Sequence, residues 1–205
     1  MLKIDSKREL RELYLPGREP SLVDVPDMGF LMVDGRGDPN TDAAYVEAIE
    51  ALFSVAYTVK FALKRRPSGG VDFTVMPLES LWWTEGEPTL SLGDKSGWSW
   101  TAMIMQPDFV DAEAVQEACS QAALKHATPA LGRLRYERFV EGTAAQVMHI
   151  GPYSEEGPTI RALHGFITDR GYTVTGKHHE IYLGDPRRTA PEKLRTVIRQ
   201  PFTAQ

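Results

Sequence analysis

The feature that most constrains the fold is an order of elements that occurs twice along the 205 residues. In each half the sequence predicts a strand, a loop, a long helix and two further strands, and the halves meet near residues 107–142. The pseudo-repeats cover about residues 22–106 and 143–202. Side-chain identity between them is low, but order and spacing agree, which favours internal duplication of one unit. We therefore expect a single α+β domain over residues 1–205, with an antiparallel sheet, two long helices on one face and a ligand cleft at the pseudo-dyad.

The first half is dominated by one amphipathic helix. Thr41 or Asp42 is expected to cap it, and apolar residues at helical spacing continue to about Leu63, before Pro67 ends the helix. A loop rather than a tight hairpin is expected over residues 84–97. The strands expected in this half cover residues 29–33, 71–83 and 98–105.

The second half repeats the order after a connecting region. Residues 1–21 are charged, and we expect them to form a lead-in segment wrapped on the surface. Residues 131–140 are expected to be the end of a helix plus a connection. The remaining expected elements are helices over 111–125 and 155–170 and strands over 144–150, 178–183 and 196–201.

Composition and charge exclude several classes of protein. Apolar residues make up 42% of the chain and charged residues 25%, as in soluble globular proteins, and the formal charge of −5 argues against nucleic acid as a partner. Cys119 is the single cysteine, so an intramolecular disulfide is excluded. No secretory leader and no apolar stretch approaching ~18 residues is seen, so we expect a cytoplasmic protein without a membrane partner. We expect no cofactor, and the sequence does not indicate the oligomeric state.

A cluster of aromatic residues is the main candidate for a binding site. All four tryptophans lie within residues 82–100, and Glu79 lies just before them. Trp98 and Trp100 share one face of a strand, and bulky aromatics around an acid predict a cage for a flat or cationic ligand that also includes Trp82. Clustered tryptophans are also common in ordinary cores, and that interpretation stays open.

Three aromatic residues on the long helix are candidates for the floor of this cage: Tyr45, Phe53 and Tyr57. A role in the helix core is the alternative for each of them. Glu79 is an acid early in the strand that follows this helix. Because Glu180 has an analogous place in the other half, we expect the two acids to approach the same central cleft.

The strand around Glu180 carries the second candidate site. Alternation places His178, Glu180 and Tyr182 on one face and His179 on the other. An acid in the middle of a strand is disfavoured, so either Glu180 is a buried group with a raised pKa or its strand faces solvent. Adjacent strand residues point apart, so the two histidines do not converge on one ion and we expect no metal site.

Several separated motifs fall in the order seen in one known family. They are Leu22-Val-Asp-Val-Pro26, Asp34-Gly-Arg-Gly-Asp-Pro-Asn40, Ala56-Tyr-Thr-Val-Lys60, Met76-Pro-Leu-Glu79 with Trp82-Trp83, and Glu180-Ile-Tyr-Leu183 through Thr196-Val-Ile-Arg199. Over nearly its whole length the chain resembles the GyrI-like small-molecule-binding family, and most closely its stand-alone branch. The resemblance implies a tandem pair of β-α-β-β units of the SHS2 type. Some family members are fused to DNA-binding helices, but the residues before the first strand are too few for a helix-turn-helix, so we expect no direct role in transcription.

The resemblance also implies a function. In regulators of this family an acid matching Glu180 meets cationic aromatic drugs, and stand-alone members resembling this chain are cyclopropanoid cyclopropyl hydrolases. It implies Glu180 as the catalytic acid/base and Trp82, Trp100, Tyr45 and Phe53 as cage residues. A hydroxyl such as that of Tyr182 is expected to donate to the carbonyl oxygen of the substrate. Two alternatives remain: a non-catalytic protein that sequesters aromatic drugs, and contact with a topoisomerase, which only the family name suggests.

Overall fold

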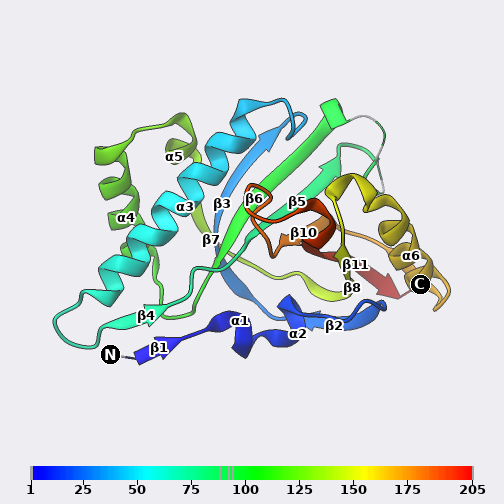
Figure 1. The fold of residues 1–205 in the computed structure, drawn as a ribbon, viewed down its shortest axis with the longest axis horizontal. Coiled ribbons are helices and arrows are strands. Elements are labelled where there is room, and N and C mark those ends of the chain that lie inside the picture. The colour runs from blue at the N-terminus through cyan, green and yellow to red at the C-terminus, as the bar shows by residue number, and fades with distance from the viewer. Residues whose placement is uncertain (1, 88, 92, 94, 205) are drawn as a thin grey trace.

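The computed structural model describes residues 2–87, 89–91, 93 and 95–204 (Figure 1). Its centre is an antiparallel sheet in the order β2-β8-β11-β10-β5-β6-β3-β7, and β9 pairs with the far end of β11. A separate parallel pair joins β1 (Leu2–Ile4) to β4 (Val71–Phe73). The strands of the main sheet are β2 (Ser21–Val25), β3 (Met28–Arg36), β5 (Leu78–Thr84), β6 (Trp98–Gln106), β7 (Arg135–Phe139), β8 (Gly142–Ile150), β9 (Tyr172–Val174), β10 (His178–Tyr182) and β11 (Arg195–Ala204).

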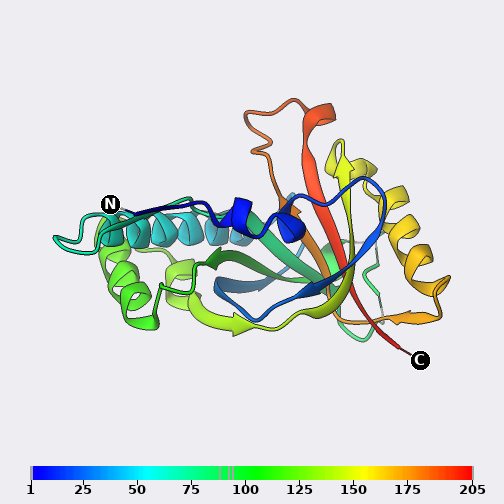
Figure 2. The ribbon, with the colours of Figure 1, turned by 90° about the horizontal axis from the view of Figure 1, so that it is seen from below.

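Helices α3 (Ala43–Lys64) and α6 (Gly157–Thr168) cover the same face of this sheet, over its two halves (Figures 1 and 2). In the register Ser80 lies opposite Glu180 and Glu180 opposite Ile198, so the three side chains share a face. Tyr45 of α3 is hydrogen-bonded to Ser80, and Leu163 of α6 packs in one apolar cluster with Ile198. Both helices therefore pack on the face that holds Glu180.

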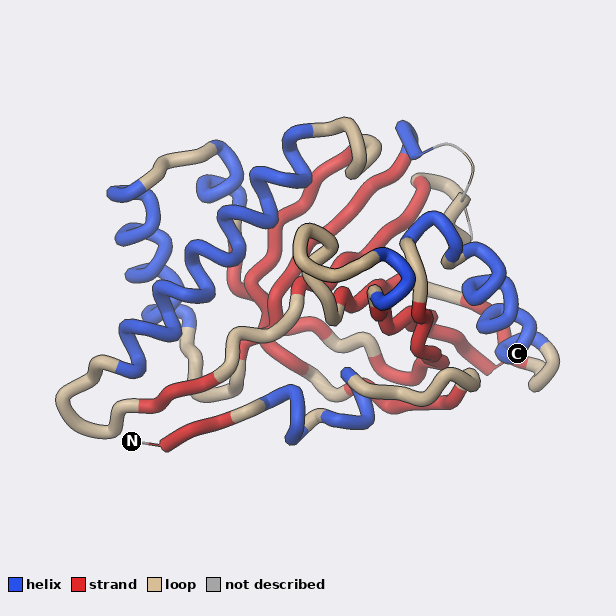
Figure 3. Tube along the Cα trace, in the orientation of Figure 1, coloured by secondary structure: helices blue, strands red, loops and turns tan. Residues whose placement is uncertain are grey.

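Further helical segments complete the fold (Figure 3). α4 packs beside α3 at one end of the molecule, away from the centre of the sheet. Within the described residues, no helix combines the length and the apolar character that a membrane crossing needs. The segments are α1 (Ser6–Glu9), α2 (Arg11–Tyr14), α4 (Ala112–Lys125), α5 (Pro129–Arg133) and 3₁₀ turns at Lys95–Gly97, Tyr153–Glu155 and Pro191–Lys193.

The predicted helix in the first half is confirmed in detail. Of the two candidate caps, Asp42 holds the position, and its side chain accepts a hydrogen bond from the Ala44 amide at 2.9 Å. Most of the apolar stripe is buried, as Leu52 and Val59 show with exposures of 0%, while Phe53 is partly buried. The helix ends at Lys64, whose charge suits the negative end of the helix dipole.

The strand order is symmetric about the centre of the sheet. From the outside to the middle, one half runs β8-β11-β10 and the other runs β3-β6-β5. In both halves the first strand of the unit is outermost, its third strand comes next and its second strand lies at the centre. The two halves join where β10 pairs with β5. This is the arrangement that duplication of a β-α-β-β unit would produce, and it confirms the predicted α+β class. The boundaries of the repeats stay a prediction.

Two strand predictions differ from the structure. Residues 71–83 are not one strand, because β4 ends at Phe73 and β5 begins only at Leu78, after Pro77, which has no amide hydrogen for a ladder. Residues 131–140 are not mainly a connection, since they hold the end of α5 and all of β7. β7 is an edge strand whose exposed charged residues hide the strand pattern.

The prediction of a surface lead-in for residues 1–21 holds for most of the segment, which is exposed or half-buried, but it missed the buried residues that anchor it. Leu13 and Tyr14 are only 5% and 1% exposed and join the main apolar core. The segment lies across the face of the sheet opposite α3 and α6. Its backbone is fixed there by Gln146, which donates to the Glu12 carbonyl at 2.6 Å, and by Arg199, which donates to the Leu13 carbonyl at 2.7 Å. The N-terminal segment is therefore anchored in the folded core through Leu13 and Tyr14.

Candidate functional site

The register of three strands decides which predicted site residues meet. β10 pairs with β5 so that Glu180 lies opposite Ser80 and His178 lies opposite Trp82, and on β6 Trp100 lies opposite Trp82. Paired residues in an antiparallel ladder project on the same side. The acid and the tryptophans that the sequence singled out separately therefore share the helix-covered face.

Glu180 is held at both carboxylate oxygens. His178 Nε2 lies 2.9 Å from Oε1, and the Tyr182 hydroxyl donates to Oε2 at 2.7 Å. Trp82 Nε1 in turn donates to the Tyr182 oxygen at 3.1 Å. Burial alone would raise the pKa of Glu180, but the hydrogen bonds from His178 and Tyr182 hold it below its usual value. Glu180 is thus buried, which excludes a solvent-facing strand, but its pKa is lowered, whereas the interpretation of a buried acid expected it to be raised.

Four aromatic side chains form a continuous cluster beside Glu180, which we term the aromatic cage: Tyr45, Trp82, Trp98 and Trp100. Ring centroids lie 5.2 Å apart for Tyr45 and Trp82, 5.0 Å for Tyr45 and Trp100, and 5.3 Å for Trp82 and Trp98. The Trp100 ring lies against Gly35, where any Cβ would overlap it. All four side chains are at most 8% exposed, so a flat ligand enters only if the rings separate.

A second acid, Glu156, lies against Glu180 and was missed by the sequence analysis. Glu156 immediately precedes α6 and is 4% exposed, and its Oε1 is buried with no hydrogen-bond partner among the described residues. Burial and the neighbouring charge of Glu180 raise the pKa of Glu156 to about 9. Its sequence context, two glutamates at the start of a helix, is typical of exposed residues and gave no signal.

The two carboxyl groups have pKa values shifted in opposite directions. Near neutral pH Glu180 is ionised while Glu156 keeps its proton, since like charges in contact do not both ionise. Such a pair supplies one base and one acid at the same place. Tyr153 and Lys95, also absent from the prediction, lie nearby: the Tyr153 and Tyr182 rings are 5.5 Å apart, and the Lys95 ammonium is 5.0 Å from the Trp98 ring centre.

Glu79 does not reach this site, contrary to expectation. It lies opposite Ile181 in the ladder, so its side chain projects to the other face of the sheet. There Tyr14 donates to Oε1 at 2.7 Å and His179 Nε2 lies 3.0 Å from Oε2. The true counterpart of Glu180 is Ser80, one residue further along, and a shift of one residue reverses the face.

His179 continues this buried network on the opposite face. Its Nδ1 lies 2.9 Å from Glu141, which also accepts a hydrogen bond from Arg199 at 3.0 Å. Burial would lower the pKa of His179, yet the Glu141 and Glu79 carboxylates raise it to about 9. The pKa of Glu141 falls to about 2, because the charges of His179 and Arg199 outweigh its burial. The network is a set of paired charges with a structural role.

Phe53 and Tyr57 also lie outside the cage. Their rings are 6.3 Å from each other, Phe53 packs against the main core, and Tyr57 is 46% exposed. Tyr57 lines a cavity of about 460 Å³ between α3 and α4 instead. Within the described residues, no group of three or more histidines, cysteines or acids is arranged to hold a metal ion.

Comparison with solved structures gives close relatives over the whole chain. An uncharacterised conserved protein from Listeria innocua is 43% identical, with a TM-score of 0.89, and the match covers 98% of this chain and all of that one. A hydrolase from Listeria innocua is 40% identical, with a TM-score of 0.85 and the same coverage. The C-terminal domain of EcmrR, at 15% identity and a TM-score of 0.59, covers 91% of this chain and 98% of its own and shares the fold. No curated protein matches the sequence.

The family assignment follows from these matches and from the family model. The GyrI-like small molecule binding domain matches residues 18–202, which include every strand of the main sheet and both helices on its face except for the last two residues of β11. The chain therefore belongs to the GyrI-like small-molecule-binding family.

Proposed function

We propose that the protein binds flat aromatic xenobiotics in the aromatic cage and hydrolyses the cyclopropane ring of cyclopropanoid DNA-alkylating compounds, which protects the cell. The observation that supports this is a pair of buried acids beside the cage: Glu180, held by His178 and Tyr182, and Glu156, whose pKa is raised by burial and by the charge of Glu180. A relative 40% identical over the whole chain is described as a hydrolase, in agreement with the proposal.

The reaction needs few groups because the substrate supplies most of the driving force. Water forms a bond to the ring carbon, the cyclopropane C–C bond breaks, and its electron pair moves into the conjugated carbonyl as the ligand aromatises. Glu180 accepts the proton of the water, a step that contributes roughly 10²–10⁴-fold. Glu156 supplies a proton to the carbonyl oxygen, and a proton then passes from Glu180 to Glu156, which restores the pair.

Tyr182 has a different part from the one expected. Its single hydroxyl proton is donated to Glu180, so it is not available for a carbonyl oxygen. The Trp82 indole holds the hydroxyl from the other side. In this proposal Tyr182 positions the base, and the cage holds the plane of the ligand so that the water lies in line with the bond that breaks.

The test is incubation of the purified protein with a duocarmycin-type compound, with detection of the water adduct by mass spectrometry. Glu180→Gln keeps the size of the side chain and removes the base, so ligand binding should persist while turnover falls about 10²–10⁴-fold. Glu192→Gln, on the exposed turn before β11, is the matched control and should leave turnover unchanged. Full turnover in Glu180→Gln would refute the assignment.

The role of Glu156 has its own control one residue away. Glu156→Gln should lower turnover, whereas Glu155→Gln, which is exposed, should not. In the unsubstituted protein turnover should decline as pH rises through about 9, where Glu156 loses its proton. An alkaline limb that persists unchanged in Glu156→Gln would exclude Glu156 as the donor.

A non-catalytic drug-binding role is the alternative, and one observation favours it. A buried carboxylate bordered by aromatic rings is also what an aromatic cation requires, through charge and contact with the ring faces. Under this alternative a cationic aromatic dye binds, Glu180→Gln abolishes its binding, and no cyclopropanoid gives a product. Product formation with the unsubstituted protein decides against it.

A further inference from the structure

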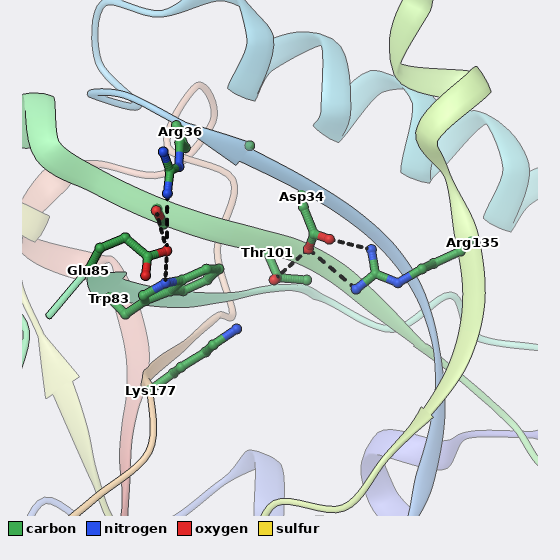
Figure 4. Close-up of a pocket in the computed structure, with 9 residues that line it drawn as sticks. Asp34, Arg36, Trp83, Glu85, Thr101, Arg135 and Lys177 are labelled. Carbon is green, nitrogen blue, oxygen red and sulfur yellow. Dashed lines mark hydrogen bonds and ion pairs between the residues drawn. The ribbon is translucent and has the colours of Figure 1, made fainter.

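A separate cavity of about 310 Å³ lies on the face of the sheet opposite the aromatic cage (Figure 4). We term it the Lys177 pocket. Trp83 projects into it, on the side of β5 opposite to Trp82. Its walls come from β3, β5, β6 and β7, so rigid strands build most of it. The residues that line it are Asp34, Gly35, Arg36, Trp83, Glu85, Ser99, Thr101, Arg135 and Lys177.

Both carboxylates of the Lys177 pocket are already paired. Arg135 donates to Asp34 at 2.8 Å, and Thr101 donates to the same carboxylate at 2.7 Å. Arg36 donates to Glu85 at 3.2 Å. Neither acid is therefore available to hold a cationic ligand, although each could accept a further weak contact.

Lys177 is the cation of the pocket lining that forms no ion pair among the described residues. Its ammonium lies 3.4 Å from the centre of the Trp83 ring. The other two cations, Arg36 and Arg135, are each paired with a carboxylate. Burial lowers the pKa of Lys177, although the charges of Asp34, Glu85 and Glu137 partly offset this effect.

The geometry points to a second ligand site, which binds a small organic monoanion through its carboxylate. The carboxylate meets the Lys177 ammonium, and the remainder of the ligand lies in the cavity beside Trp83. The volume is at the lower end for ligand pockets and suits a molecule with a single ring. This site is independent of the Glu180–Glu156 pair, because the sheet separates the two.

The test uses benzoate as the anionic probe and benzylammonium as its cationic match, each titrated into the full chain by calorimetry. Benzoate should bind and benzylammonium should not. Lys177→Met should weaken benzoate about tenfold or more, the loss of one charge-assisted hydrogen bond. Lys193→Met, an exposed lysine on the turn before β11, and Glu180→Gln should both bind benzoate like the unsubstituted protein.

A second readout does not depend on the substitutions. In protein with isotopically methylated lysines, benzoate should raise the pKa of Lys177 and leave that of Lys193 unchanged. Equal affinity of Lys177→Met and the unsubstituted protein would overturn the inference. So would benzylammonium binding as tightly as benzoate, or the absence of any benzoate binding at millimolar concentration.

Discussion

Removing one hydroxyl from the buried network tests whether the N-terminal segment is part of the core. In Tyr14→Phe the ring stays in place and only the 2.7 Å hydrogen bond to Glu79 is lost. Tyr14 is 1% and Glu79 0% exposed, so water does not replace the donor. A hydrogen bond to a charged group contributes about 1.5–3 kcal/mol, and a chain of this length loses roughly 2–4 °C in Tm per kcal/mol. We expect the free energy of unfolding to fall by that amount, and Tm by about 3–12 °C.

Urea denaturation followed by circular dichroism measures the change, with Tyr57→Phe as the matched control. Tyr57 is 46% exposed, so the control should stay within about 0.5 kcal/mol of the unsubstituted protein. Glu79→Gln combined with Tyr14→Phe completes a double-mutant cycle that isolates the coupling between the two side chains. If Tyr14→Phe were no less stable than Tyr57→Phe, the segment would not be held by this bond and the argument would fail.

Three further predictions concern pH and packing. The pKa of His179 is raised to about 9, so its contribution to stability is complete below the ordinary histidine pKa of ~6.5 and is lost as pH rises through 9. We expect the free energy of unfolding to fall by about 2 kcal/mol between pH 7 and 9, and urea denaturation at each pH measures this fall. Glu156 is neutral in the folded protein up to about pH 9 but ionised in the unfolded chain, so it also makes the free energy of unfolding fall as pH rises. In Glu156→Gln the free energy of unfolding should therefore decline less steeply with pH. A decline as steep as in the unsubstituted protein would contradict the raised pKa of Glu156. Gly35→Ala forces the Trp100 ring to move, so it should lower the free energy of unfolding by about 1–3 kcal/mol and weaken ligand binding. The control is Gly132→Ala, which has free space around it in a helix and should be neutral or slightly stabilising in thermal denaturation. Equal stability of the two variants would show that the glycine does not fix the Trp100 ring.

Local pattern predicted what depends on alternation within one strand. His178, Glu180 and Tyr182 do share a face, as do Trp98 and Trp100, because the side-chain period of a strand is two. The register between paired strands could not be predicted in the same way. Glu79 was matched to Glu180 by its place after the long helix, whereas the register matches Ser80, and nothing in the sequence around Pro77 fixes that offset.

Contacts between segments that are distant in the sequence could not be predicted either. Glu156 reaches Glu180 only because α6 packs back on the sheet, so no spacing within either segment reveals the pair. The N-terminal segment is charged along most of its length, and only the burial of Leu13 and Tyr14 shows that it closes the opposite face. The charge pattern of this segment predicted solvent exposure, and it failed at the two apolar side chains that decide the placement of the segment.

Glu79 and Glu180 lie on neighbouring strands and on opposite faces of the sheet, and the partners of the two acids differ. Glu79 has a donor at each oxygen within a network of paired charges, so a change of protonation there would leave His179 or Tyr14 without a partner. Glu180 is also held at both oxygens, but it contacts a second carboxyl, that of Glu156, which keeps a proton and an unpaired oxygen. Under the proposed function a proton passes from Glu180 to Glu156, and the unpaired Glu156 oxygen leaves the second acid free to take part in such a transfer.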